Sequence, residues 1–302
     1  MHWRQEVLKL RLMLVINPNA GGGRAAAQVE PTVRILRELG VEFDMERTSG
    51  PGDATRIARA AAVSGYDVVA SMGGDGTANE VVNGIADTST ALALVPVGTG
   101  NDFSAAIGLP KGDVAAACRA IARGRTRRVD LCRVNDRYFI SSFGTGFDAA
   151  VTHLANRKYK KIGGIWAYIF SVLNVIWTYR PGPVHIVADG RGVTKPTLMV
   201  AVTNWRSIGG GMVICPDAAI DDGTMDMCIV DRVPIPRFLQ CFPKVMKGTH
   251  TSMKEVHMLR ASHVTINCSS PQPCHVDGEV FFADSLDLRI FPGAITVVVG
   301  EG

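Results

Sequence analysis

The stretch Ser71–Glu80 (S-M-G-G-D-G-T-A-N-E) combines consecutive glycines with a carboxylate, Asp75. Glycine lets backbone N–H groups approach an oxyanion closely, and a helix that begins here adds the positive end of its dipole. Asp75 would repel a phosphate unless a cation or a proton lies between them. The combination therefore indicates a metal-nucleotide site. The alternative interpretation is a glycine-rich turn with a surface Asp.

Two other loops share this composition. Asn17–Gly23 (N-P-N-A-G-G-G) and Gly98–Asp102 (G-T-G-N-D) each follow an apolar run typical of a buried strand. Strand-like and helix-like segments alternate at short spacing up to about residue 125, which predicts a parallel sheet with helices on both faces. Ligands of such sheets bind at the carboxyl ends of the strands, so we expect all three loops on one rim.

The character of the sequence changes after Arg123–Arg128. Short β-like runs separated by Gly, Pro, Asn and Asp predict an antiparallel sandwich. Two groups of carboxylates in this half could carry chemistry, one suited to an oxygen-ligated cation and one to a general base with its partner. An ordinary Asp-Gly turn is the alternative for each. The groups are Asp221, Asp222 and Asp226 around Gly223, and Asp277 with Glu279 around Gly278.

Length and composition narrow the class of protein. A chain of 302 residues with 47% hydrophobic and 20% charged residues predicts two well-buried globular domains. The net charge of +4 is too small for a nucleic-acid binder. The seven cysteines form no C-x-x-C pair, which favours reduced thiols and a cytoplasmic location.

One apolar segment indicates contact with a membrane. Ile162–Tyr179 is rich in aromatic residues and follows the basic run Arg157–Lys161. Its glycines and polar residues interrupt it, and it falls short of the roughly 20 residues that a spanning helix needs. Basic residues beside interfacial aromatics predict peripheral membrane association, and a buried core helix is the competing explanation.

Taken together, these motifs resemble the bacterial diacylglycerol kinase catalytic-domain family of lipid kinases, which is related to sphingosine and ceramide kinases. The resemblance spans nearly the whole chain, and its motifs occur in the family's order. They are N-P-N-A-G at 17–21, G-G-D-G-T at 73–77, G-T-G-N-D-F at 98–103, I-D-D-G at 220–223 and D-G-E at 277–279.

This resemblance implies a fold of two domains. An N-terminal α/β domain with a parallel sheet, similar to phosphofructokinases and NAD kinases, would bind ATP over residues 1–128. A C-terminal all-β sandwich would bind the lipid over residues 129–289. The last strand would return to the first domain, over about residues 290–302. The active site would then lie between the two domains.

The resemblance also implies roles for individual residues. Asp75 would face the Mg²⁺ bound to the phosphates, although related sphingosine kinases make it a candidate base as well. Asp277 or Glu279 would take the proton from the lipid hydroxyl. A structural Mg²⁺ would be held by the Asp222 side chain and the carbonyls of Ala219 and Thr224. The ATP contacts would be Asn17, Pro18, Asn19, Ala20, Gly21, Thr48, Gly73, Gly74, Asp75, Gly76, Thr77, Ala78, Asn79 and Thr99.

The expected activity is transfer of phosphate from ATP, with Mg²⁺, to a lipid hydroxyl at a membrane surface, most simply that of diacylglycerol in phospholipid metabolism. An NAD kinase is the alternative enzyme, suggested by Asn79-Glu80 after the glycine motif. A non-catalytic nucleotide- or lipid-binding regulator is the alternative of another class. The lipid acceptor, the choice of base and the oligomeric state, with a homodimer among the options, stay open.

Overall fold

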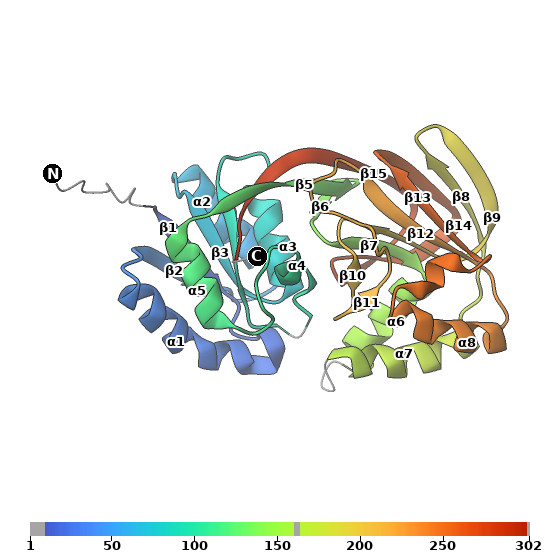
Figure 1. The fold of residues 1–302 in the computed structure, drawn as a ribbon, viewed down its shortest axis with the longest axis horizontal. Helices are drawn as coiled ribbons and strands as arrows, with labels where there is room; N and C mark the ends of the chain where they lie inside the picture. The colour runs from blue at the N-terminus through green and yellow to red at the C-terminus, as the bar shows by residue number, and fades with distance from the viewer. Residues whose placement is uncertain (1–9, 99, 160–163, 301–302) are drawn as a thin grey trace.

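A computed structural model describes residues 10–98, 100–159 and 164–300 (Figure 1). Strands and helices alternate in the first part of the chain, as the sequence predicts. These elements are β1 (Leu12–Ile16), α1 (Arg24–Glu38), β2 (Phe43–Arg47), α2 (Asp53–Val63), β3 (Val68–Gly73), α3 (Asp75–Ile85), β4 (Ala91–Pro96), α4 (Asp102–Ala106) and α5 (Val114–Arg123), with a 3₁₀ turn, η1 (Ala20–Gly23), before α1.

The first four strands form a parallel sheet in the order β4-β3-β1-β2. Every residue of β3 and β4 is buried, because α1 and α5 cover one face of the sheet while α2 and α3 cover the other (Figure 1). Strands buried on both faces read as continuous apolar runs, which is why the sequence identifies them readily. The predicted α/β fold of this part is confirmed.

The second part of the chain is dominated by antiparallel strands and carries three helices. Its elements are β5 (Thr126–Val134), β6 (Arg137–Phe139), β7 (Ser142–Gly146), α6 (Phe147–Leu154), η2 (Ala155–Tyr159), α7 (Gly164–Thr178), β8 (Pro183–Ala188), β9 (Arg191–Thr203), β10 (Ser207–Ile208), β11 (Met212–Val213), β12 (Met225–Asp231), α8 (Ile235–Val245), η3 (Thr249–Ser252), β13 (Val256–Ala261), β14 (His263–Val276) and β15 (Glu279–Val298).

The predicted sandwich is confirmed, and its strands share one apolar core with contributions from β5–β9 and β12–β15. Strand β14 does not end at the Ser-Pro-rich segment that follows Asn267. It continues through a bulge between Asn267 and Gln272. Helices α6, α7 and α8 pack over the sandwich around Phe147, Val175 and Phe238. Two prolines within α8, Pro236 and Pro243, obscure its helical pattern in the sequence.

Strand β15 joins the two parts of the chain. Its final residues pair with β4 in parallel, at Val297 opposite Leu92, and lie in the core of the first sheet. Its earlier residues, Leu286–Ile290, lie in the core of the sandwich. Along most of its length it also pairs with β5. The two cores are therefore connected by a continuous β-ribbon (Figure 1).

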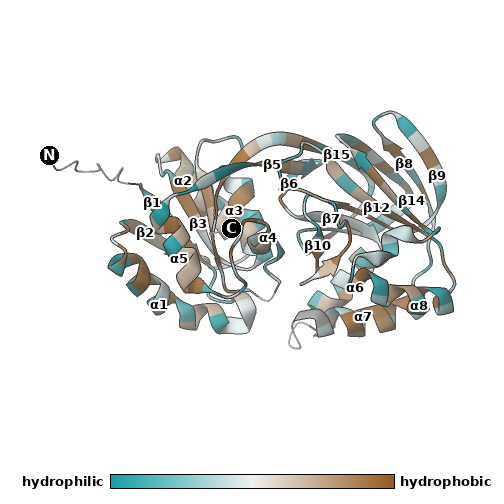
Figure 2. Ribbon diagram, in the orientation of Figure 1, coloured by the Kyte–Doolittle hydropathy of each residue, from teal (hydrophilic) through white to brown (hydrophobic). Residues whose placement is uncertain are grey.

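Apolar residues fill the central strands of both parts and occupy most of α7 (Figure 2). Among the described residues, no helix combines the length and the hydrophobicity that crossing a bilayer requires.

Candidate active site

Asp75 is the first residue of α3, at the carboxyl end of β3. Its Oδ2 accepts a hydrogen bond from the Asn101 N–H at 2.7 Å, and its Oδ1 accepts one from the Asp102 N–H at 3.0 Å. These bonds attach the loop after β4 to the loop after β3. A Cβ at Gly100 would lie 2.5 Å from Asp75 Oδ2, so glycine is needed beside this carboxylate.

The carboxylates around Asp75 carry more negative charge than nearby cations balance. Burial, joined by the charges of Asp102 and Asp277, raises the pKa of Asp75 to about 7, and the two N–H donors offset this only in part. Asp102 is buried and accepts from Lys111 Nζ at 3.2 Å and from the Gly210 N–H at 2.8 Å. An uncompensated carboxylate with an oxygen donor set fits Mg²⁺.

The loop after β1 lies against the same loops. Asn17 Nδ2 donates to Thr77 Oγ1 at 2.9 Å, and Asn17 Oδ1 accepts from the Asn19 N–H at 3.1 Å. A Cβ at Gly21 would lie 2.6 Å from the carbonyl oxygen of Val97, at the end of β4. The predicted nucleotide loops 17–21 and 73–79 therefore meet at one edge of the sheet.

Thr48 and Thr99 are the two remaining predicted nucleotide contacts. The Thr48 N–H donates to the Ile16 carbonyl at 2.8 Å, which places Thr48 at the same edge. Thr99 falls outside the described residues. Arg24 supplies positive charge at this edge. Its Nε donates to the Gly21 carbonyl at 2.9 Å, and this bond holds the guanidinium beside the loop.

Asp277 is buried with φ at 45° in the turn between β14 and β15. Its carboxylate accepts four hydrogen bonds, and burial raises its pKa above the usual range while these donors oppose the shift. With four donors engaged, the carboxylate braces the structure. The donors are the N–H groups of Ile140 (3.1 Å), Ser141 (3.0 Å) and Ser142 (2.8 Å) and the Asn79 amide (2.9 Å).

Glu279 differs from Asp277 in exposure and in partners. Its side chain is 41% exposed, and Arg137 Nη2 forms an ion pair with its Oε2. Its Oε1 lies over the glycine loop, 3.2 Å from where a Cβ at Gly76 would be. Arg137 Nη2 also donates to Asn79 Oδ1 at 3.4 Å. One carboxylate oxygen of Glu279 thus faces the first turn of α3, which begins at Asp75.

The predicted structural metal site lies in the turn before β12. Asp222 Oδ1 accepts from the N–H of Thr224 at 3.1 Å and from its hydroxyl at 2.9 Å, and Asp222 Oδ2 lies 3.7 Å from Arg260 Nη1. No group of three or more His, Cys, Asp or Glu side chains among the described residues converges as metal ligands. A cation at Asp222 would therefore depend on backbone carbonyls such as those of Ala219 and Thr224.

Sequence reasoning missed four residues of this site. Asp102 was within a quoted motif, so its type and position could have identified it. Arg137 and Gly210 carry no local signal, because their partners are distant in the chain; Arg137 and Glu279 are 142 positions apart. Lys111 lies only nine positions from its partner Asp102 but belongs to no motif.

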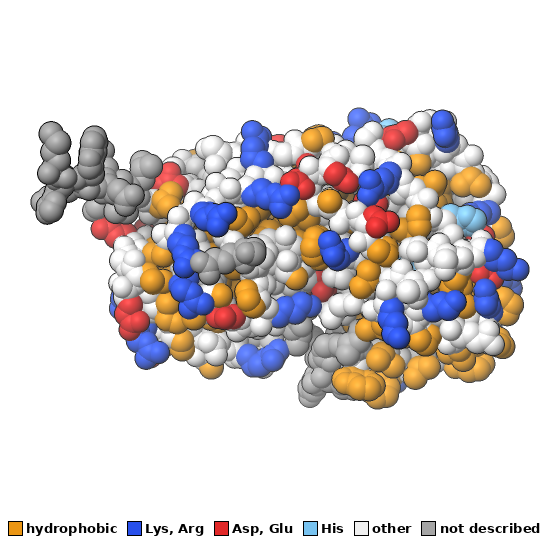
Figure 3. Space-filling view, viewed as in Figure 1, with side chains coloured by type: hydrophobic (Ala, Val, Ile, Leu, Met, Phe, Trp, Pro, Cys, Tyr) orange, Lys and Arg blue, Asp and Glu red, His pale blue; other side chains and the backbone are white. Residues whose placement is uncertain are grey.

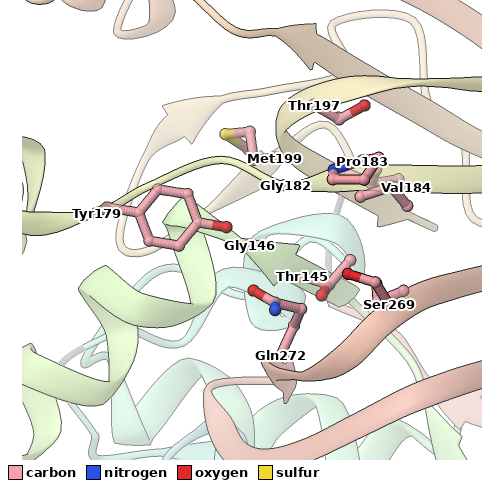
Figure 4. Close-up of a pocket in the computed structure, with 12 residues that line it drawn as sticks. Thr145, Gly146, Tyr179, Gly182, Pro183, Val184, Thr197, Met199, Ser269 and Gln272 are labelled. Atoms are coloured by element: carbon pink, nitrogen blue, oxygen red, sulfur yellow. The ribbon is translucent and has the colours of Figure 1, made fainter.

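Two pockets in the described chain lie away from these carboxylates. One, at the end of the sandwich, is lined by Thr145, Tyr179 and Gln272 (Figure 4). Its volume of about 20 Å³ has room for about one water molecule. The other has a volume of about 460 Å³ and is lined by Tyr66, Thr90 and their neighbours. It opens at the amino ends of β3 and β4, opposite the glycine loops.

Comparison with protein families divides the chain into two matches. Residues 11–134 match the diacylglycerol kinase catalytic domain, and residues 141–299 match the YegS C-terminal NAD kinase beta sandwich-like domain. Together the two matches cover both the parallel sheet and the sandwich.

Similar proteins share the fold along the whole chain. A diacylglycerol kinase of Bacillus subtilis (strain 168) is 31% identical over 271 residues, with 89% of each chain covered. One of Mycobacterium tuberculosis (strain CDC 1551 / Oshkosh) is 32% identical over 302 residues, covering 98% of this chain and 96% of that one. A crystal structure of a diacylglycerol kinase from Bacillus anthracis str. Sterne superposes with TM-score 0.74 at 22% identity, covering 96% and 97% of the two chains.

The bracing role of Asp277 leads to a prediction about stability. Asp277→Ala leaves three backbone N–H groups without their acceptor and removes one of the two acceptors of the Asn79 amide, so the free energy of unfolding should fall by about 3 kcal/mol or more. Urea titration measures this loss. Asp284→Ala, which removes an exposed carboxylate from the strand that follows this turn, β15, is the control and should change stability by less than about 0.5 kcal/mol. An Asp277→Ala protein as stable as the control would refute the bracing role.

The charge imbalance at Asp75 leads to a prediction about pH. Since its folded-state pKa is about 7 against an ordinary value of 3.8, the folded chain holds this proton more tightly than the unfolded chain. Ionising Asp75 should therefore lower stability as pH rises through this interval, by up to about 1.4 kcal/mol per pH unit. Urea titrations in EDTA between pH 5 and pH 8 should show a shallower decline for Asp75→Asn. Parallel curves for the two proteins would contradict the raised pKa.

Proposed function

Since this chain belongs to the diacylglycerol kinase family and is a lipid kinase, we propose that it transfers the γ-phosphate of ATP, with Mg²⁺, to the hydroxyl of diacylglycerol. The observation that carries the proposal is the position of Glu279, whose free carboxylate oxygen faces the glycine loop that begins α3. A nucleotide loop and an accessible carboxylate on one site are what phosphoryl transfer to an alcohol requires.

The glycine loops hold the nucleotide. Backbone N–H groups after β1 and β3, with the amino end of α3, provide donors for phosphate oxygens, and Arg24 adds positive charge beside them. Asp75 would hold the Mg²⁺ that accompanies the nucleotide, and this ion would neutralise charge on the phosphates. Because the Asn101 and Asp102 N–H groups fix both oxygens of Asp75, the carboxylate keeps its orientation before the nucleotide binds.

Glu279 is the base in this proposal, and Arg137 positions it. The guanidinium holds Oε2, so Oε1 remains available to accept the proton of the acceptor hydroxyl as the phosphate is transferred. Asp277 is unsuited to this role, since its oxygens already accept four hydrogen bonds.

Family membership decides between the alternatives drawn from the sequence. The chain is a lipid kinase, so the NAD kinase and non-catalytic interpretations are set aside. Diacylglycerol is favoured as the acceptor because the relatives from Bacillus subtilis and Mycobacterium tuberculosis are named diacylglycerol kinases.

The decisive experiment combines an acceptor panel with a variant of the base. Labelled ATP, Mg²⁺ and mixed micelles of diacylglycerol should yield labelled phosphatidate. Glu279→Gln should lower kcat by about 100-fold or more, because it removes the proton acceptor while keeping the shape. The KM for ATP should stay within about threefold, since the nucleotide loops are untouched.

Glu38→Gln, a change of the same kind on the exposed side of α1, serves as the control and should leave kcat unchanged. Sphingoid base, ceramide, monoacylglycerol and NAD complete the panel. Preferred labelling of one of these would reassign the acceptor. Full activity of Glu279→Gln would refute the base.

Gly100 provides a steric test of the nucleotide site. A methyl group at Gly100→Ala would displace the Asp75 carboxylate, 2.5 Å away, and so disturb cation binding. The rise in melting temperature that Mg²⁺-ATP produces over ATP with EDTA should be largely lost. Gly50→Ala, where a Cβ meets no atom within 4 Å, should keep the full rise. Equal rises in the two variants would show that Asp75 does not hold the cation.

A further inference from the structure

Helix α7 is apolar on two opposite faces, and only one of them is covered. Ala167, Val172, Val175 and Ile176 are buried, the last three in a cluster that includes residues of α6, α8 and β9. The outward face exposes large apolar side chains at spacings of about one helical turn, which places them in a single stripe. This stripe, called the α7 ridge below, consists of Trp166 (61% exposed), Phe170 (43%), Leu173 (47%) and Trp177 (61%).

Further exposed apolar residues lie at α8. Phe238 of α8 belongs to the same buried cluster as Val175 of α7, so both helices contribute to one apolar cluster. Leu239 of α8 and Met246, which directly follows α8, are exposed. Figure 3 shows apolar side chains gathered along the edge of the molecule formed by these helices. Contiguous exposed apolar surface of this kind marks an interaction site.

The two segments that contain α7 and α8 carry no acidic residue, and the acidic residue that pairs with α8, Glu255, is bound by Arg237. The sequence contains no Asp or Glu between Asp148 and Asp189, and none between Asp231 and Glu255. These intervals include all of α7 and α8. Arginine and lysine side chains are exposed at both ends of α7 and along α8, and they are Arg157, Lys158, Arg180, Lys244 and Lys247. The face therefore complements an apolar surface bordered by negative charge.

We propose that the α7 ridge and the exposed residues of α8 dock this protein on bilayers that contain anionic phospholipids. Trp166 and Trp177 stand at the two ends of the ridge, and tryptophan favours the boundary between head groups and acyl chains. Phe170 and Leu173 between them supply apolar area for shallow burial, and the surrounding cations attract anionic head groups. This docking goes beyond phosphoryl transfer and requires neither ATP nor the acceptor.

A second copy of the chain fits this face less well. A two-fold interface places the same surface on both partners, so the basic side chains of one copy would meet those of the other. No acidic residue in the two intervals could relieve that repulsion. An anionic bilayer has both the apolar interior and the opposite charge.

Vesicle flotation without nucleotide or diacylglycerol tests the proposal. The full chain should float with vesicles of phosphatidylcholine and phosphatidylglycerol, and less with phosphatidylcholine alone, because the lysines and arginines need anionic head groups. Trp166→Glu with Trp177→Glu should reduce the bound fraction at least about tenfold. Met45→Glu with Val63→Glu is the matched control, since it charges two exposed apolar residues of the other domain, 50% and 79% exposed, and it should bind as the original chain does.

Three outcomes would overturn the proposal. They are no flotation of the original chain with phosphatidylglycerol vesicles, equal flotation of the ridge variant, and a dimer of the original chain that the ridge variant dissociates without either binding vesicles. Size-exclusion chromatography with light scattering reports the last. Equal melting temperatures of the variants show that folding is intact, and Trp166→Ser with Trp177→Ser replaces a variant that fails to fold.

Kinase assays separate this proposal from the proposed activity. With a short-chain diacylglycerol dispersed as monomers, the ridge variant should keep the kcat of the original chain. With the same lipid class in anionic vesicles, its rate should fall about tenfold or more. If no variant phosphorylates any acceptor while flotation follows the ridge, then the proposed activity fails and the docking surface stands.

Discussion

The buried carboxylate of Asp277 is the constraint on which the active site depends. It accepts hydrogen bonds from backbone N–H groups at the start of β7 and from the Asn79 amide of α3. These bonds tie the sandwich to a helix of the first domain. A buried charge of this kind is costly unless every oxygen is paired, and here the pairing comes from both domains. Glu279 directly follows the turn that Asp277 fixes, so the position of this proposed base relative to the glycine loop depends on the same hydrogen bonds.

The nucleotide site itself is arranged for a ligand more than for stability. Burial and the charges of Asp102 and Asp277 raise the pKa of Asp75. Lys111 pairs with Asp102 and so neutralises only part of this negative charge. Such repulsion lowers the stability of the protein, and a bound cation would relieve it. Glycines at positions 21 and 100 leave room for the loops to approach each other. The buried strands and the hydrogen bonds of Asp277 offset the unfavourable free energy of holding these loops together.

Much of this arrangement could be predicted from local sequence. Fully buried parallel strands and the glycine loops after them have strong local patterns, so the sheet and its functional rim followed from the chain alone. The division of labour between Asp277 and Glu279 could not be predicted, because it depends on where the N–H groups of Ile140, Ser141 and Ser142 point. The ion pair of Arg137 with Glu279 could not be predicted either, because it forms where β6 lies beside the start of β15. The prolines of α8 obscured a helix that packs in the same apolar cluster as α7.

The path of β15 has a consequence for biosynthesis. The sheet of the nucleotide domain gains its β4 neighbour only from Val297 and the residues beside it, which follow every other strand in the chain. On the ribosome, β1 to β4 emerge long before this partner exists, and β4 is left with an open edge. The sandwich is synthesised during that interval. Completion of the first sheet is thus coupled to synthesis of the sandwich.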